Sequence, residues 1–269
     1  MKKILLFIII SGILIFLISA KSIKNHHILK RNTNDFKHIC NFKEELKYRY
    51  SNYYKTNKNL SLEDIVTRVN IGLDRPFYKG AKPTPHLNKN YILVNKYLYL
   101  DKNYIPNNLE KTNSDYSKKG MMLVKEAKDM FEKMYYDAKK EGYNIRIMSS
   151  YRSYNYQEKL YNNYKNKEGK EEADKYSARP GFSEHQTGLC VDIDDKNLNY
   201  EDFYKSSSYE WMINNSYKYG FILRYPKDKE NITGYIYESW HYRYVGIDIA
   251  KYIHDNNITF DEYYSKYIR

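Results

Sequence analysis

The order of apolar and polar positions divides the chain into three parts. Residues 4–20 are almost wholly apolar. The segment that follows, up to residue 90, is rich in Lys, Asn and His and carries turn-forming Gly and Pro towards its end. Periodic patterns begin at about residue 91. We therefore expect an apolar N-terminal segment at 1–20, a basic stem and irregular region at 21–90, and a folded domain at 91–269.

Within the folded domain, the clearest helix is expected at 121–140. Apolar side chains recur there at helical spacing, and Gly142 follows as a C-terminal cap. Further patterns predict helices at 154–167 and 209–219, strands at 91–94, 143–148, 189–193 and 242–245, and shorter helices within 42–54 and after Ser61. Helices and strands mix without a βαβ order, so we expect an α+β fold with a small mixed or antiparallel sheet flanked by helices.

The N-terminus has the pattern of an export signal. Met1-Lys2-Lys3 places a short positive region ahead of the apolar segment. The apolar length lies between that of a signal peptide and that of a short membrane span, and Ile18-Ser19-Ala20 is a poor cleavage site. The segment is therefore interpreted as a cleaved signal peptide or as an uncleaved membrane anchor. Both interpretations place the remainder outside the cytoplasm, in the cell envelope.

The formal net charge of +12 favours polyanionic partners. Because an exported chain meets no cytoplasmic nucleic acid, we expect no nucleic-acid partner. The polyanions available outside the cytoplasm are anionic wall polymers and lipid headgroups. The alternative is that the charge serves solubility alone.

A set of metal-ligand residue types lies in the second half of the chain. His185 and Asp192 are seven residues apart, Gly188 allows a turn between them, and His241 follows far downstream. Catalytic zinc takes three protein ligands from His and carboxylate and leaves a fourth position open. Glu238, three residues before His241, is placed to take a proton from an attacking water and return it to the leaving amine.

Three sequence blocks carry a family resemblance: 149–154 with Gln157, 183–192, and 238–244. They resemble the S-G-Y-R-S-x-x-x-Q, S-x-H-x-x-G-x-A-x-D and E-x-W-H-x-R-Y blocks of the VanY-type D-alanyl-D-alanine carboxypeptidases, relatives of the VanX dipeptidases. The resemblance covers roughly residues 91–250. It implies a Hedgehog/DD-peptidase-like zinc peptidase fold with one zinc ion.

The resemblance also implies roles for individual residues. His185, Asp192 and His241 would bind the zinc ion, and Glu238 would be the catalytic base. Arg152 would act both in catalysis and in substrate binding, holding the C-terminal carboxylate of the substrate or the developing oxyanion. The alternative for Arg152 is a structural ion pair.

Three further polar residues belong to these blocks. Gln157 and Ser183 would hydrogen-bond the peptide substrate, and the alternative for both is a local capping or loop contact. Glu184, beside the first zinc ligand, is expected to be solvated.

The chain departs from the family pattern at two positions. Ser150 replaces the usual Gly of the first block, and Cys190 replaces the usual Ala of the second. We expect Cys190 to be a small buried apolar residue. A disulfide between Cys40 and Cys190 is an alternative that export permits.

The resulting hypothesis is an exported zinc enzyme that cleaves the terminal D-Ala-D-Ala bond of peptidoglycan stem peptides. An LD-carboxypeptidase or an L-Ala-D-Glu endopeptidase would use the same site. A non-catalytic wall-binding protein on this scaffold is a further alternative, although it would not need Glu238. The absence of Gly-x-Ser-x-Gly and Ser-x-x-Lys motifs argues against a serine acyl-enzyme.

Overall fold

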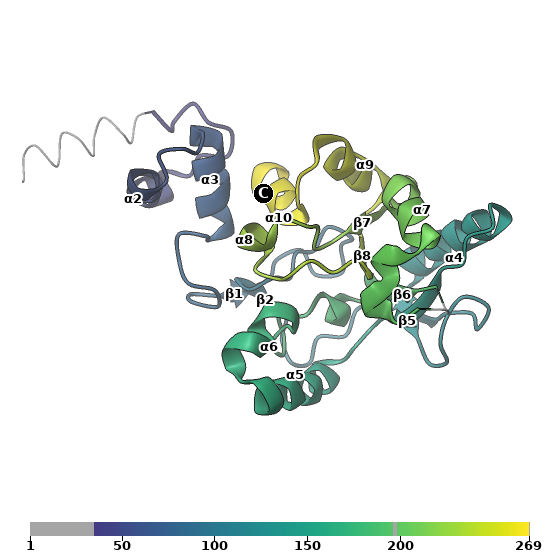
Figure 1. Ribbon diagram of the computed structural model, residues 1–269. Coiled ribbons are helices and arrows are strands. Elements are labelled where there is room, and N and C mark those ends of the chain that lie inside the picture. Colours follow the sequence, from purple (N-terminus) through teal and green to yellow (C-terminus); the bar gives the residue numbers. More distant parts are fainter. Residues whose placement is uncertain (1–34, 196–197, 269) are drawn as a thin grey trace, which may run out of the picture. The chain divides into compact units, whose positions relative to one another are not determined.

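The computed structural model describes residues 35–195 and 198–268 (Figure 1). The chain divides into two compact units between Asp74 and Arg75. The apolar segment predicted at 1–20 lies outside the described residues. Among the helices at 35–195 and 198–268, none has the length and apolar character needed to cross a membrane.

The smaller unit is built on two helices, α2 (Lys47–Thr56) and α3 (Leu62–Ile71), preceded by a 3-10 turn, η1 (Glu44–Leu46). Ser61 caps α3 by accepting a hydrogen bond from the backbone N–H of Asp64, as expected from the sequence. Phe36, Tyr50 and Ile65 are fully buried between the helices. This unit therefore has a small hydrophobic core of its own.

The larger unit contains a four-stranded antiparallel sheet in the order β5-β6-β8-β7. Its elements in chain order are β1 (Lys82–Pro83), β2 (Leu98–Tyr99), β3 (Leu109–Lys111), β4 (Met122–Val124), α4 (Lys125–Lys140), β5 (Arg146–Ser149), α5 (Tyr154–Glu168), α6 (Lys170–Tyr176), η2 (Glu184–Thr187), β6 (Cys190–Asp194), η3 (Tyr200–Lys205), α7 (Ser207–Asn215), η4 (Ser216–Tyr219), β7 (Phe221–Leu223), α8 (Glu230–Thr233), β8 (His241–Tyr244), α9 (Ile247–Asn256) and α10 (Phe260–Tyr267). The α+β fold expected from the sequence is confirmed.

Several expected elements differ from the structure. The strand expected at 143–148 begins only at Arg146, and the helix expected at 209–219 is divided into α7 and the 3-10 helix η4. The helix expected at 121–140 begins only at Lys125, because the preceding residues form β4 and pair with β3. The strand expected at 91–94 is wrong. This segment is buried but irregular, and its carbonyl groups are used by side chains instead of a strand: Arg243 donates to Ile92 O and Thr84 Oγ1 donates to Leu93 O.

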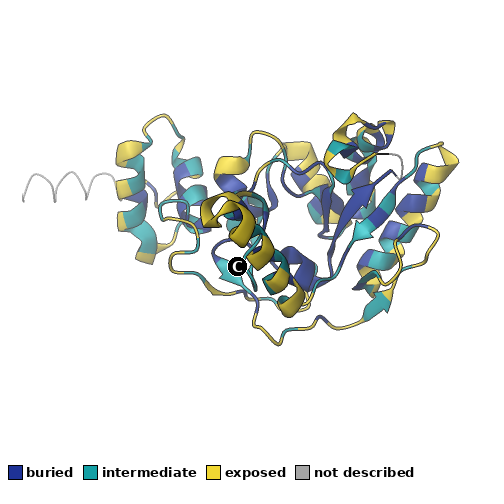
Figure 2. Cartoon of the chain, turned by 60° about the horizontal axis from the view of Figure 1, so that its bottom comes forward, coloured by how far each residue is buried: buried dark blue, intermediate teal, exposed yellow. Residues whose placement is uncertain are grey.

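The central sheet has a hydrophobic face and a polar face. Val191 and Ile193 of β6 and Tyr242 of β8 belong to one buried cluster with the apolar side of α4. Because side chains alternate along a strand, Asp192 and His241 lie on the opposite face. The two central strands, β6 and β8, are buried throughout (dark blue in Figure 2). The core thus orients the polar residues of the predicted site towards one side of the sheet.

A buried lysine lies in an aromatic cage in this unit. The side chain of Lys96 is almost completely buried, and its Nζ donates a hydrogen bond of 2.6 Å to Asp174 O. Nζ also lies 4.3 Å from the ring centroid of Tyr235, 4.9 Å from that of Phe77 and 5.5 Å from that of Tyr78. Lys96 therefore connects the segment before β2 to α6 and to the loop that leads to β8.

We expect this lysine to make stability depend on alkaline pH. Burial lowers the pKa of Lys96 from 10.5 to about 8. The charge of Arg179 also lowers it, whereas the carboxylate of Asp174 raises it. As pH falls through 10.5, Lys96 of the unfolded chain takes up a proton while Lys96 of the folded protein stays neutral, so the free energy of unfolding decreases. Below about pH 8 Lys96 of the folded protein is protonated as well, and the free energy of unfolding no longer changes. Relative to a Lys96→Met variant, the free energy of unfolding of the wild type should rise by about 2 kcal/mol from pH 8 to pH 10.

Urea unfolding of both proteins at pH 8, 9 and 10 measures this difference. The comparison with Lys96→Met cancels the ionisation of the tyrosines, which occurs in both chains. Burial also raises the pKa of the neighbouring Tyr78 and Tyr235, so these two residues stay protonated over this range in the folded protein. A difference that does not change with pH would contradict the prediction.

Candidate active site

His185 is held by a short 3-10 turn, η2, and by one backbone carbonyl. Gly188 ends this turn in the left-handed region, at φ 67°, where a Cβ would lie 2.8 Å from Leu109 Cδ2. His185 Nδ1 lies 2.6 Å from Ser150 O. Since a carbonyl oxygen only accepts, Nδ1 carries the proton and Nε2 has a free lone pair. Burial and the nearby charge of Arg152 lower the pKa of His185 to about 4, so the ring is neutral at neutral pH.

Asp192 and His241 are directly opposite each other on β6 and β8. His241 Nδ1 lies 3.2 Å from Asp192 Oδ1, and His185 Nε2 lies 3.3 Å from Asp192 Oδ2. The two imidazole rings are almost perpendicular, with centroids 5.0 Å apart. The structure therefore brings the three ligands predicted from the sequence together at one buried point.

This arrangement fits a divalent metal ion. The Asp192 carboxylate lies at short range from one nitrogen of each imidazole, and Asp192 Oδ1 is buried without a hydrogen-bond partner. An ion among them would satisfy that oxygen. Neutral imidazole and carboxylate are also the donors that zinc accepts at catalytic sites.

Cys190 lies next to this set on the same face of β6. Ligand atoms of His185, Cys190 and His241 lie within 4.8 Å of one another. Burial, with the carboxylates of Glu184 and Asp192, raises the pKa of the Cys190 thiol well above its usual range. Both Cys190 and Cys40 are free thiols, so the alternative of a disulfide between them is wrong.

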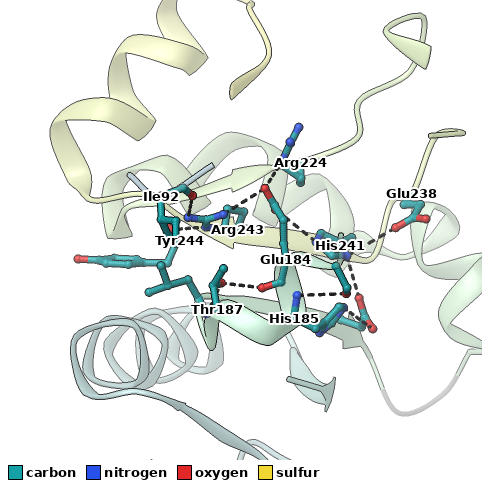
Figure 3. A network of polar contacts seen from close by, with 12 residues as sticks. Ile92, Glu184, His185, Thr187, Arg224, Glu238, His241, Arg243 and Tyr244 are labelled. Carbon is teal, nitrogen blue, oxygen red and sulfur yellow. Dashed lines mark hydrogen bonds and ion pairs between the residues drawn. The ribbon is translucent and has the colours of Figure 1, made fainter. Parts of the chain in front are cut away.

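Glu238 lies immediately before β8 and points towards the same point (Figure 3). Its Oε2 lies 3.6 Å from His241 Nδ1, and its backbone N–H donates to Tyr225 O. Burial and the charge of Asp192 raise the pKa of the Glu238 carboxyl well above its usual range. A carboxylate in this position is a stronger proton acceptor than one in water.

Arg152 contacts the predicted metal ligands directly. Its Nη2 donates to Asp192 Oδ2 and its Nε donates to Ser149 Oγ at 2.9 Å. The ion pair considered as an alternative from the sequence is therefore present. The Arg152 side chain also lines the cleft described below, so it can contact a bound peptide while it is paired with Asp192.

Gln157 and Ser183 make local contacts and also face the cleft. Gln157 Nε2 donates to Ala178 O at 2.8 Å, while its Oε1 is buried without a partner. Ser183 Oγ accepts a hydrogen bond from His185 N. The amide oxygen of Gln157 is therefore a buried acceptor with no hydrogen-bond partner among the residues that the structure describes.

The expectation that Glu184 is solvated is wrong. Its side chain is fully buried, with Oε1 2.9 Å from Arg224 Nε and 3.1 Å from Arg243 Nη1. Arg224 in turn donates to Asp261 Oδ2 at 2.7 Å. Arg243 belongs to the third sequence block, so the family pattern itself marked it as a residue of interest. Arg224 and Asp261 lie outside every motif, so no local signal indicated them.

All of the predicted site residues line one cleft of about 740 Å³: Arg152, Gln157, Ser183, His185, Asp192, Glu238 and His241. One wall is a face of α5 that carries Tyr156, Leu160, Tyr164 and Lys167. From the first to the last of these four residues, the helix rises about 16 Å. The cleft therefore extends well beyond the metal-ligand set.

The sequence matches the family model described as VanY, D-alanyl-D-alanine carboxypeptidase, over residues 120–247. Among curated proteins, YodJ of Bacillus subtilis (strain 168) is 43% identical over 181 residues. That match covers 65% of this chain and 66% of YodJ, so the chain spans just under two thirds of this relative's length.

Two solved structures extend the comparison. The LdcB LD-carboxypeptidase is 44% identical with a TM-score of 0.61, and the match covers 65% of this chain and 85% of LdcB. A mutant of the D,D-pentapeptidase VanY from a VanB-type resistance cassette, in complex with Zn(II), is 33% identical with a TM-score of 0.56. That match covers 65% of this chain and 98% of the VanY chain. The expected Hedgehog/DD-peptidase-like fold is confirmed.

Proposed function

Because the chain belongs to the VanY family of D-alanyl-D-alanine carboxypeptidases, we propose that it is a zinc-dependent carboxypeptidase acting on peptidoglycan stem peptides. The preferred reaction is hydrolysis of the terminal D-Ala-D-Ala bond. One observation carries the proposal: two imidazoles and the Asp192 carboxylate converge within 3.2–3.3 Å, with the Glu238 carboxylate beside them.

In this proposal, His185 Nε2, Asp192 and His241 Nδ1 hold one zinc ion. Zinc supplies Lewis-acid chemistry, which polarises a peptide carbonyl and makes a nearby water more acidic. Glu238 accepts the proton of the water as its oxygen attacks the carbonyl carbon. Glu238 then delivers that proton to the nitrogen as the C–N bond breaks. The reaction yields the shortened peptide, which carries a new C-terminal carboxyl group, and the free amino acid.

Arg152 and the cleft would determine how the peptide lies. The guanidinium, held by Asp192 and Ser149, faces the region where a terminal carboxylate or a developing oxyanion would be. Gln157 and Ser183 would bind the peptide backbone. The length of the cleft along α5 suits about five extended residues, which favours a stem peptide over a free dipeptide.

An LD-carboxypeptidase is the second candidate, because LdcB shares the fold at 44% identity. An L-Ala-D-Glu endopeptidase would also use these residues. A non-catalytic wall-binding protein is disfavoured by the position of Glu238. The proposed location is the cell envelope, with contacts to anionic wall polymers, and with the membrane through the segment at 1–20.

The deciding experiment is mass spectrometry of defined stem peptides after incubation with the zinc-loaded protein. Release of D-Ala from a pentapeptide supports the DD-carboxypeptidase. Release from a tetrapeptide alone identifies the LD-carboxypeptidase, and an internal cut identifies the endopeptidase. A chelator should stop the reaction and added zinc should restore it. No cleavage of any substrate by zinc-loaded protein would refute an enzymatic function.

Replacing Arg152 by Ala should lower kcat/KM by about 10²- to 10³-fold, the usual cost of losing a group that stabilises an oxyanion. Zinc affinity should fall much less, because Arg152 contacts Asp192 but is not a ligand. Steady-state kinetics and zinc titration of the same preparation separate the two effects. A variant that loses zinc in proportion to activity would assign Arg152 a purely structural role.

A further inference from the structure

A buried ionic network lies on the Nε2 side of the His241 ring, whereas Asp192 lies near Nδ1. Figure 3 shows Glu184, Arg224 and Arg243 of this network beside His241. The members of the network are Glu184, Arg224, Arg243 and Asp261, all of them fully buried. Two carboxylates and two guanidinium groups give this set no net formal charge. Asn95 Nδ2 adds a hydrogen bond of 2.7 Å to Asp261 Oδ1. The network therefore links η2 to β8, to α10 and to the residue just after β7.

The two oxygens of Glu184 have different surroundings. Oε1 lies 2.9 Å from Arg224 Nε and 3.1 Å from Arg243 Nη1, so both arginines approach the same oxygen. Oε2 is buried without a hydrogen-bond partner and lies 4.0 Å from His241 Nε2. His241 Nε2 is likewise buried without a partner. Two unsatisfied polar atoms thus face each other at 4.0 Å, about 1 Å more than the length of a charge-assisted hydrogen bond.

The opposite nitrogen of the same ring faces the metal-ligand set. His241 Nδ1 lies 3.2 Å from Asp192 Oδ1 and 3.6 Å from Glu238 Oε2. A neutral imidazole that binds a metal through Nδ1 must carry its proton on Nε2. That N–H needs an acceptor, because a buried donor without one is costly. Glu184 Oε2 is the acceptor that the structure offers.

We propose that Glu184 is a positioning residue for His241, which holds the ring with Nδ1 towards the metal and the proton on Nε2. This inference rests on the proposed function, since it assumes zinc at the site. The arginines fix the carboxylate by one oxygen and so aim the other at the ring. The turn η2 would then serve both histidines: His185 enters the ligand set, and Glu184 orients the second ligand.

The test compares two isosteric variants of the full chain, Glu184→Gln and Asp261→Asn. Each variant removes one buried negative charge from the network, so at least one arginine loses a charged partner. Only Glu184 faces His241. In Glu184→Gln, the arginines retain the amide oxygen, so the amide NH₂ opposes the His241 Nε2–H. Zinc affinity, measured by competition with a chromophoric chelator, should fall about 10- to 100-fold. In Asp261→Asn it should stay within a few-fold of the wild type.

A second readout does not depend on either variant folding. Proton–nitrogen NMR of the histidines in zinc-loaded wild type should show His241 protonated on Nε2, with a slowly exchanging, hydrogen-bonded proton. A His241 protonated on Nδ1 would overturn the inference. So would equal zinc affinity of Glu184→Gln and wild type, or equal losses in both variants. Failure of the wild type to bind zinc would instead refute the proposed function itself.

Discussion

Replacing Glu238 by Gln is expected to lower kcat by about 10²- to 10⁴-fold, the range for loss of a general base, while leaving zinc bound. The amide keeps the volume of the side chain but cannot accept the proton of the attacking water. Glu238 lies 3.6 Å from His241 Nδ1 and is not one of the atoms that converge at 3.2–3.3 Å. Its replacement should therefore separate chemistry from metal binding. Hydrolysis of the substrate identified by mass spectrometry, followed with zinc analysis of the same samples, measures both quantities.

Glu230→Gln is the matched control for this experiment. Glu230 is exposed at the start of α8 and lies outside the cleft lining, so the same change of charge should leave kcat within a few-fold of the wild type. Activity that survives in Glu238→Gln would refute the assigned base. Loss of zinc in that variant would instead place Glu238 among the metal ligands.

The sequence predicted which side chains converge at the candidate site better than it predicted the bounds of the elements around them. Asp192 alternates with Val191 and Ile193 in an apolar strand. The period of two along a strand therefore predicts that Asp192 lies on the face opposite these two residues. The pairing of Asp192 with His241 joins residues far apart in the chain, and it was indicated by the set of metal-ligand residue types and by the family blocks. The local pattern therefore predicted on which face of its strand Asp192 lies, whereas the metal-ligand residue types and the family blocks predicted that Asp192 and His241 lie together.

The errors arose where distant residues determine the environment. Glu184 is adjacent to a histidine in a polar-looking segment, and its burial follows from the arginines on β8 and just after β7. The segment 91–94 has the apolar content of a strand, but Arg243 takes one of its carbonyl groups. In both cases an arginine from elsewhere in the fold satisfies the polar groups. Periodicity within a short window does not contain that information.

Asp192→Asn is expected to weaken zinc binding at least about 100-fold, more than loss of an outer-shell partner costs. The amide preserves shape but presents a weak, neutral ligand to the ion. Cys190→Ala, which restores the residue type usual in the family blocks, should leave zinc affinity within a few-fold of the wild type. The contrast matters because Cys190, like Asp192, lies beside both histidines on the same face of β6.

Geometry and coordination number favour Asp192 over Cys190. The Asp192 oxygens lie 3.2–3.3 Å from one nitrogen of each imidazole, whereas the ligand atoms of His185, Cys190 and His241 lie within 4.8 Å of one another. Four protein ligands would also close the site, and catalytic zinc needs a position for water or substrate. Cobalt-substituted protein provides an independent check, because a thiolate ligand adds an intense near-ultraviolet charge-transfer band. If that band appears in the wild type and is lost in Cys190→Ala, then Cys190 is a ligand and the three-ligand site is wrong.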